Sequence, residues 1–375
     1  MKLSCLQENL NKGLGIVGRA VATRTTLPIT NNVLIATDQS RLKLAATNLE
    51  IAISCWLGAK VEEEGTITVP ARILTEFINS LPSDRVDLSL SHHTLELKCA
   101  RFEARISGID AADFPPIPKV SEGVNTQIEP EAFRLAIGQV VFATATEDTR
   151  PVLTGVCAEF DGSDLTLAAA DGFRLAVHKT PLLVPVKEKM GIIIPGRSLS
   201  ELNRLLADQK EPVELAINPG KSQVLFRLKD VELVSQLIQG TFPNFRQLIP
   251  QSYNTRVVVD RGEFLRAMKT ASIFARDNSN IVRFEVIPGE ELTPGRLNLS
   301  ARSEQVGDNV GEIDAQVMGE GAKIAFNSKY LIDVLSVLPE EKVALEMTTS
   351  SSPGVIRPIG SDNYLHVIMP MFVQW

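Results

Sequence analysis

The sequence predicts an α+β fold in which three similar domains follow one another, each with two helices packed on a largely antiparallel sheet. Three observations support this prediction. One helix-like pattern of apolar residues recurs at intervals of 127 and 131 residues, and a second recurs at intervals of 125 and 132. Strand-like segments fill the spaces between them. Solenoid repeats are shorter, about 20–50 residues, so a chain of separate domains is favoured.

The first pattern predicts one helix early in each repeat. Its three copies start at Leu6, Phe133 and Phe264 and continue to Ala22, Ala145 and Ala275. In each copy, apolar residues recur every three or four positions, which gives a helix one apolar face to bury.

The second pattern predicts another helix about 60 residues later in each repeat. A short apolar segment with a proline or asparagine comes first, and an amphipathic stretch follows. The three copies are Val69–Pro70 with a stretch to Leu81–Pro82, Ile194–Pro195 with a stretch to about Leu206, and Phe326–Asn327 with a stretch to Leu338–Pro339.

Strands are predicted between these helices. One repeated strand has the three copies Leu42–Thr47, Leu165–Ala170 and Arg296–Ala301. Period-two alternation, typical of half-buried strands, marks Leu88–Leu90, Leu95–Lys98 and Val213–Ile217.

Phe-Pro pairs mark the ends of the first two repeats, at Asp113–Pro115 and at Thr241–Pro243. We therefore expect a first domain over residues 1–120, a second over 121–250 and a third over 251–375. Domains of this size are ordinary for globular proteins.

Composition excludes several classes of protein. No apolar run approaches the roughly 18–20 residues that span a bilayer, and Glu8 comes too early for a signal peptide. A cytoplasmic protein is the expectation. The four cysteines lie far apart without a C-x-x-C pair, so free buried thiols are expected, with no metal site and no cofactor. The net charge of −7 argues against a protein that grips DNA with its whole surface, although a basic lining can coexist with an acidic exterior.

Six motifs, in order along essentially the whole chain, resemble the bacterial DNA polymerase III beta subunit family, the sliding clamps. They are Arg24–Ile29, Val69–Arg72, Ala112–Pro115, Ala170–Val177, Phe242–Arg246 and Met369–Met371.

The resemblance implies a processivity factor without a catalytic site. Two subunits of three domains would close head to tail as a homodimer ring around duplex DNA, without sequence specificity. The implied partners are an ATP-driven clamp loader, the replicative polymerase catalytic subunit and repair polymerases, which bind through short peptide motifs. A contact that turns each subunit by 180° closes at two copies, so this geometry is self-consistent.

The resemblance also implies DNA contacts at Arg24, Arg72 and Arg197. Arg246 borders the family's peptide pocket and can lie near DNA, and Arg150 belongs to the segments expected to line the ring. Dispersed phosphate contacts suit a sliding tether because they position a protein without reading sequence. The alternative is that these are ordinary solvated residues, or that they pair with a neighbouring carboxylate.

A partner-peptide pocket between the second and third domains follows from the same resemblance. Methionines suit a surface that accepts several ligand sequences, because the side chain is flexible and polarizable. The alternative is that Leu175 and Met369 are plain core residues. The implied residues are Leu153, Gly172, Phe173, Arg174, Leu175, Pro243, Arg246, Leu248, Val367, Met369, Pro370 and Met371.

The chain departs from the family pattern at three places near this pocket. Phe173 stands where a histidine is common, and Pro151–Val152 replaces a pair of tyrosines. The C-terminus continues past Met371 through Phe372–Trp375, and Trp375 could cover the pocket or pack on its rim.

The dimer interface implied by the resemblance uses Ile273 and Phe274 of the third domain, with Ile106 of the first domain as a candidate partner. Arg101 and Arg105 could meet Glu304 or nearby acids.

Two other functions compete with the clamp. An enzyme is disfavoured because the sequence has no P-loop and no G-x-S-x-G, and His92–His93 has no third ligand nearby. Asp171–Gly172 is explained more simply by a tight turn before Arg174. A peptide-binding scaffold that never encircles DNA predicts the same pocket, but it would tolerate the loss of Arg24, Arg72 and Arg197.

Overall fold

A computed structural model describes residues 1–23, 26–118, 120, 123–147, 149–290 and 293–374. The chain divides into two compact units. The first unit consists of Met1–Glu131, Leu182–Val186 and Arg197–Ile238, and the second of Ala132–Pro181, Lys187–Gly196 and Gln239–Trp375.

Two antiparallel sheets form the first unit. The smaller sheet has the order β5 (Lys60–Glu63), β1 (Lys2–Leu6), β7 (Arg85–Ser91), β8 (Thr94–Cys99) and β9 (Phe102–Ser107). The larger sheet has the order β10 (Val124–Ile128), β15 (Val213–Ile217), β16 (Gln223–Arg227), β17 (Val231–Gln236), β4 (Ile51–Leu57), β3 (Arg41–Thr47), β2 (Asn32–Asp38) and β6 (Thr66–Pro70).

Helices α1 (Gln7–Val17) and α2 (Ala71–Ser80) pack against each other in the first unit, and most of α4 (Gly196–Leu205) belongs to it as well. Helix α1 buries Leu10, Leu14 and Val17, and it contacts β3 and β4. The spacing of these residues is the three-to-four-residue period from which the helix was predicted.

The second unit contains one long antiparallel sheet. Its order is β14 (Met190–Pro195), β11 (Gly155–Asp161), β12 (Asp164–Ala170), β13 (Arg174–Pro181), β25 (Tyr364–Ile368), β24 (Gly354–Pro358), β23 (Lys342–Met347), β18 (Thr255–Asp260), β21 (Gly307–Gly319), β20 (Gly295–Ser303), β19 (Ile281–Ile287) and β22 (Ala322–Asn327).

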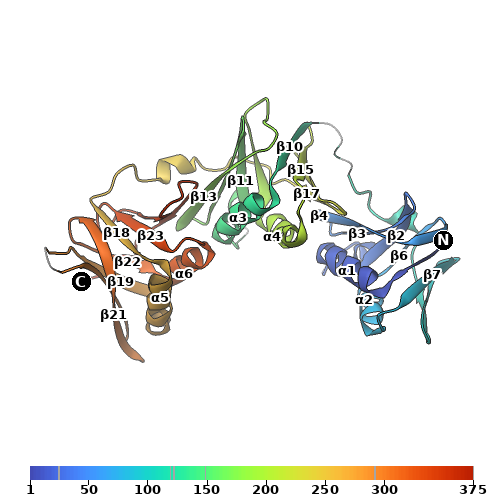
Figure 1. The fold of residues 1–375 in the computed structure, drawn as a ribbon, viewed down its shortest axis with the longest axis horizontal. Helices are drawn as coiled ribbons and strands as arrows, with labels where there is room; N and C mark the ends of the chain where they lie inside the picture. Colours follow the sequence, from blue (N-terminus) through green and yellow to red (C-terminus); the bar gives the residue numbers. More distant parts are fainter. Residues whose placement is uncertain (24–25, 119, 121–122, 148, 291–292, 375) are drawn as a thin grey trace. The chain divides into compact units, whose positions relative to one another are not determined.

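Helices α5 (Arg261–Ala275) and α6 (Ser328–Val337) lie side by side in the second unit (Figure 1). Most of α3 (Pro130–Val140) also belongs to this unit. Side chains cap both helices where the sequence changes from strand to helix. Asp260 accepts a hydrogen bond from the Glu263 N–H at the start of α5, and Asn327 accepts one from the Lys329 N–H at the start of α6. Such caps satisfy backbone donors that have no partner within the helix.

The predicted α+β class and all six predicted helices are confirmed. Several boundaries differ by a few residues. Leu6, taken as the first residue of a helix, ends strand β1 with an exposed side chain, and α1 begins at Gln7. Helices α3 and α5 begin three residues before the predicted Phe133 and Phe264, and α1 and α3 end before the predicted Ala22 and Ala145. The three copies of the repeated strand are β3, β12 and β20. Strand pairing also joins segments far apart in the chain, since β4 pairs with β17 and β13 with β25.

All four cysteines are free and buried, as predicted. Burial raises the pKa of Cys5 and Cys157 to about 12 and that of Cys55 to about 11, so these thiols stay protonated at neutral pH. The described residues hold no cluster of three or more histidine, cysteine, aspartate or glutamate side chains that could bind a metal ion. None of the helices within those residues is both long enough and apolar enough to cross a bilayer.

Candidate functional site

The candidate site is an apolar patch on the long sheet of the second unit. Strands β13 and β25 pair in a register that sets Leu175 opposite Val367, and both side chains are buried. Val355 of β24 and Phe245 of the segment between β17 and β18 belong to the same apolar cluster. These four residues form the floor of what we call the apolar patch.

The rim of the apolar patch is exposed. Leu248 ends the short 3-10 helix η7 (Phe245–Leu248) and is 53% exposed, and Met369 follows β25 and is 45% exposed. The Met369 N–H donates to the Phe173 carbonyl oxygen over 2.8 Å, which fixes the chain after β25 against the turn before β13. Exposed Leu and Met beside a buried apolar floor favour contact with another apolar surface.

The structure distributes the other predicted pocket residues between surface and interior. Gly172, Phe173, Pro243 and Arg246 are exposed, Met371 is half-buried, and Leu153 and Pro370 are buried. The core alternative therefore holds for the Leu175 side chain and not for Met369.

A tight turn precedes β13, as the sequence predicted. Asp171 Oδ1 accepts hydrogen bonds from the backbone N–H groups of Phe173 and Arg174, over 2.9 and 3.0 Å. Gly172 has a φ of +95°, which favours glycine. A methyl group built there would lie 3.3 Å from Nη1 of Arg150, so the turn and that arginine are in close contact.

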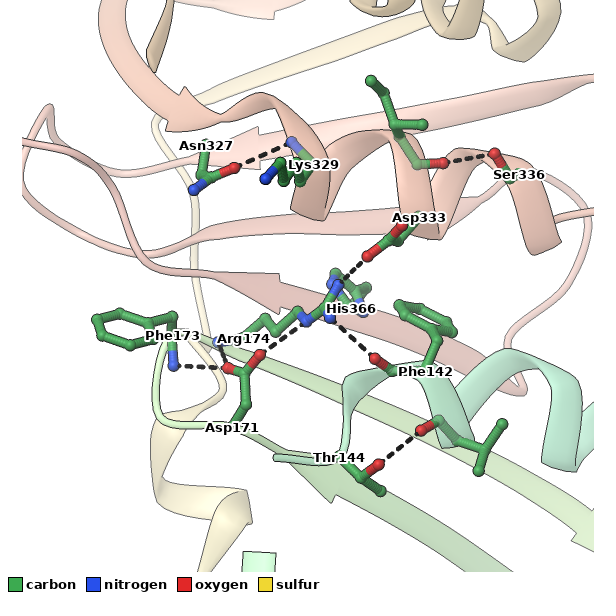
Figure 2. A network of polar contacts seen from close by, with 12 residues as sticks. Phe142, Thr144, Asp171, Phe173, Arg174, Asn327, Lys329, Asp333, Ser336 and His366 are labelled. Atoms are coloured by element: carbon green, nitrogen blue, oxygen red, sulfur yellow. Dashed lines mark hydrogen bonds and ion pairs between the residues drawn. The ribbon is translucent and has the colours of Figure 1, made fainter. Parts of the chain in front are cut away.

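Arg174 is the centre of a polar network (Figure 2). Its Nε donates to Asp171 over 2.9 Å, its Nη1 to Asp333 of α6 over 2.6 Å, and its Nη2 to the Phe142 carbonyl over 2.8 Å. The side chain is only 10% exposed. Arg174 therefore supports the turn beside the apolar patch from within.

Aromatic rings complete this support. The Arg174 guanidinium lies 4.6 Å from the ring centroid of Tyr330 and 5.3 Å from that of Phe142. The ring of the exposed Phe173 stacks on Tyr330, with centroids 6.4 Å apart. Sequence analysis missed Phe142, Tyr330 and Asp333, because only the folded chain brings them to Arg174.

A second buried polar network involves strands β13 and β25 and helix α3. His178 Nδ1 is 2.7 Å from Gln139 Oε1, and the Tyr364 hydroxyl is 3.3 Å from His366 Nδ1. Burial lowers the pKa of His178 to about 4 and, with the charge of Arg174, that of His366 to about 3. Both histidines are therefore neutral at pH 7 and act as core residues.

The arginines predicted to contact DNA differ in their surroundings. Arg72 and Arg197 are exposed on the first turns of α2 and α4, and Arg72 Nε is 2.8 Å from Glu76. Arg150 is exposed beside Gly172. Arg246 forms a two-pronged ion pair with Glu159, which leaves it less available to phosphate. Arg24 lies outside the described residues.

The residues predicted at the dimer interface also differ. Ile273 is exposed on α5, and Phe274 beside it is half-buried. Ile106 is only 6% exposed, so it has little surface to offer a partner. Phe102 is exposed on the same strand, β9, at the edge of that sheet.

The departures from the family pattern are mostly on the surface. Pro151 is exposed and Val152 is half-buried, and Phe372 is among the most exposed apolar residues of the described chain. Trp375 lies outside the described residues, so its predicted packing on the rim stays a prediction.

Family models match the chain over nearly its whole length. The DNA polymerase III beta subunit N-terminal domain matches residues 1–118, the central domain matches 127–244, and the C-terminal domain matches 246–372.

Individual relatives agree with these matches. The beta sliding clamp of Synechocystis sp. is 34% identical and that of Synechococcus elongatus 33% identical, each with 99% of both chains covered. The crystal structure of the DNA polymerase sliding clamp from Bacillus subtilis superimposes with a TM-score of 0.94 at 31% identity, with both chains fully covered.

Full-length similarity in sequence and in fold decides the family. The chain belongs to the DNA polymerase III beta subunits, the beta sliding clamps, which are non-catalytic factors that bind DNA and confer processivity on the polymerase.

Proposed function

We propose that two copies of this chain close head to tail as a ring around duplex DNA, and that the apolar patch holds short peptides of the polymerase and other DNA-processing proteins. A clamp loader opens and closes the ring, and repair polymerases share the patch with the replicative enzyme. The observation that carries the proposal is the exposed Met369 and Leu248 beside the buried Leu175–Val367 pair.

The patch suits a peptide better than a folded partner surface. Its floor is apolar, and its rim is built from the ends of segments that are separate in the chain, η7 and the residues after β25. Peptide-binding grooves share this composition, with apolar anchors for affinity and a few polar groups that set register. Phe173, where a histidine is common in the family, favours an apolar neighbour at the edge of the patch.

Exposed arginines on the helices supply weak contact with DNA. Arg72 and Arg197 hold the same place, the first turn of the second helix in successive repeats. An exposed arginine beside Glu76 keeps N–H donors for a passing phosphate while its charge is partly balanced. Contacts of this kind hold the duplex without the base readout, about 1–3 kcal/mol per pair, that would stop sliding.

The dimer contact is proposed to join α5 of one copy to the edge strand β9 of the other. Ile273 gives α5 an exposed apolar side chain, and β9 has one hydrogen-bonded neighbour, β8. Phe102, rather than Ile106, presents the apolar side chain on that strand. A free strand edge is a ready template for pairing with another chain.

Retention on DNA tests the ring. The protein is loaded onto nicked circular plasmid by its clamp loader, the salt concentration is raised, and half of the sample is linearised. Affinity from 6–10 phosphate contacts falls by about 10³–10⁵ between 50 and 200 mM salt. Protein that stays on circles and leaves linear DNA is held topologically, as proposed. Equal loss from circles and linear DNA at high salt would show binding by charge alone and would favour a scaffold that does not encircle DNA.

A further inference from the structure

A polar hollow of about 300 Å³ opens in the second unit, next to the apolar patch. Its floor is the sheet at β18, β23 and β24, and its wall is the chain from Pro250 to Tyr253, which continues the segment that carries Phe245 and Leu248. Val355 lines the hollow and also belongs to the apolar cluster. The two features therefore share a strand and a wall.

Two arginines and one buried carboxylate face the hollow. Glu346 is 9% exposed, and its carboxylate lies 3.1 Å from Arg357 Nε and 3.5 Å from Arg256 Nη1. Two positive charges thus share one buried negative charge. Asp362 also lines the hollow, but it is exposed, so water screens its charge more effectively.

The arginines have donors to spare. A guanidinium carries five N–H donors, and within the described part of the chain Arg357 commits only its Nε to a hydrogen bond. Arg256 Nε is buried and has no hydrogen-bond partner among those same residues. These donors suit an acceptor, and a carboxylate fits best because it meets the Nη edge of an arginine with two parallel hydrogen bonds.

We infer that this hollow binds an Asp or Glu side chain of the same peptide whose apolar side chains cover the apolar patch, an inference that rests on the function proposed above. The spacing follows from β24. Val355 and Arg357 lie on one face of the strand, two residues apart, which is about 7 Å. An extended peptide beside them covers that distance in two residues, so the acid lies two or three residues from the apolar anchor.

Selection from a random display library of twelve-residue peptides tests the inference. On the wild-type protein, we expect apolar residues together with an Asp or Glu two or three positions away. On Arg357→Gln, the apolar residues persist and the acidic preference disappears. For one selected peptide, changing the acid to its amide weakens binding to the wild type by about tenfold and leaves binding to Arg357→Gln unchanged, as a charge-assisted hydrogen bond requires.

Two further variants keep the test decisive. Glu346→Gln/Arg256→Gln/Arg357→Gln removes the buried carboxylate together with both arginines that share its charge and should behave like Arg357→Gln, so it replaces that variant if Arg357→Gln fails to fold. Arg296→Gln removes an exposed arginine that pairs with Glu312 outside the hollow and should select the same peptides as the wild type.

The possible failures are distinguishable. Apolar peptides selected without an acidic preference overturn the inference and leave the apolar patch intact. An acidic preference that survives in Arg357→Gln also overturns it. Failure of the wild type to select any peptide whose binding depends on Met369 overturns the inference together with the proposed peptide site.

Discussion

Arg174 Nη1 lies 2.6 Å from Asp333 Oδ2, an ion pair between a strand of one sequence repeat and a helix of the next, 159 residues apart. The same guanidinium also holds Asp171 and the Phe142 carbonyl. Three segments that lie far apart in the sequence thus meet at one side chain, and the turn beside the apolar patch depends on it.

Replacing Arg174 tests this dependence. We expect Arg174→Met to lower the free energy of unfolding by about 3–5 kcal/mol, because Asp171 would remain mostly buried without its counter-charge. Urea denaturation followed by circular dichroism measures the change. Arg296→Met is the matched control, since its pair with Glu312 is exposed and contributes at most about 1 kcal/mol. Equal loss in the two variants would show that the Arg174 network has no special role.

Stability should fall in mild acid because of the buried histidines. The pKa of His178 is about 4 in the folded chain, against about 6.5 when unfolded, so the unfolded state binds more protons between these values. The stabilisation is complete above pH 6.5 and is lost as the pH falls toward 4, by about 2 kcal/mol at pH 5. We expect His178→Gln to flatten the dependence of the thermal midpoint on pH between 7 and 5.

The control for the acid experiment is His92→Gln, an exposed residue in the turn between β7 and β8. It should leave the pH profile of the wild type unchanged. A His178→Gln profile as steep as that of His92→Gln would assign the acid sensitivity to other groups.

The proposed DNA contacts are tested by Arg24→Ala/Arg72→Ala/Arg197→Ala. This variant should fold, because Arg72 and Arg197 are exposed, but it should load poorly and stimulate synthesis weakly. Before ring closure, each lost phosphate contact should reduce the slope of log affinity against log salt by about 0.9. The matched control replaces Lys98, Arg227 and Arg296, exposed basic residues on strands, with the same change in net charge. Full stimulation of the polymerase by the first variant would contradict the assignment.

The apolar patch is tested at Met369, whose side chain has surface to lose. Met369→Ala should weaken binding of the polymerase III catalytic subunit by about tenfold, since burying a methionine side chain contributes about 1.5–3 kcal/mol. The thermal midpoint should not move. Val310→Ala, a more exposed apolar residue on β21, should bind the polymerase like the wild type. Equal affinities of the two variants would place the polymerase contact elsewhere.

The dimer contact is tested at Ile273. A charge in an apolar contact leaves an uncompensated carboxylate, so Ile273→Asp should raise the dissociation constant of the dimer by at least about 100-fold. Phe274→Ala should weaken the dimer less, because that residue is partly covered within its own chain. Sedimentation velocity over a concentration series measures both variants. Leu183→Asp, which is about as exposed as Ile273, should stay dimeric.

Sequence periodicity was sufficient to predict the helices and the repeated strand, because both depend on neighbouring residues. The buried face of α1, with Leu10, Leu14 and Val17, follows from positions three and four residues apart. Pairings over longer separations left no such signal. Nothing in the sequence sets Arg174 against Asp333 or Arg246 against Glu159, and those contacts decide which arginines remain available to a partner.

Burial at Ile106 shows the same limit. The resemblance offers Ile106 as a candidate interface residue, but the sequence does not say how much of its side chain the chain's own core covers. In the folded chain Ile106 is only 6% exposed and pairs with the buried Leu95 of β8, so it has little surface to offer a partner.

Strand β4 pairs with β17, and β13 pairs with β25. A single sequence repeat therefore cannot be excised without breaking strand pairing at its borders. A fragment limited to residues 127–244, the part matched by the central family model, would keep β17 and β13 but lose β4 and β25, one neighbour of each. It would carry two unpaired strand edges, β17 with Val231, Leu233 and Val234 and β13 with Leu175, Ala176 and Val177, and such edges pair with one another. The fragment 127–244 should therefore aggregate when it is expressed by itself. A soluble truncation of this protein needs boundaries that keep each of these strand pairs together.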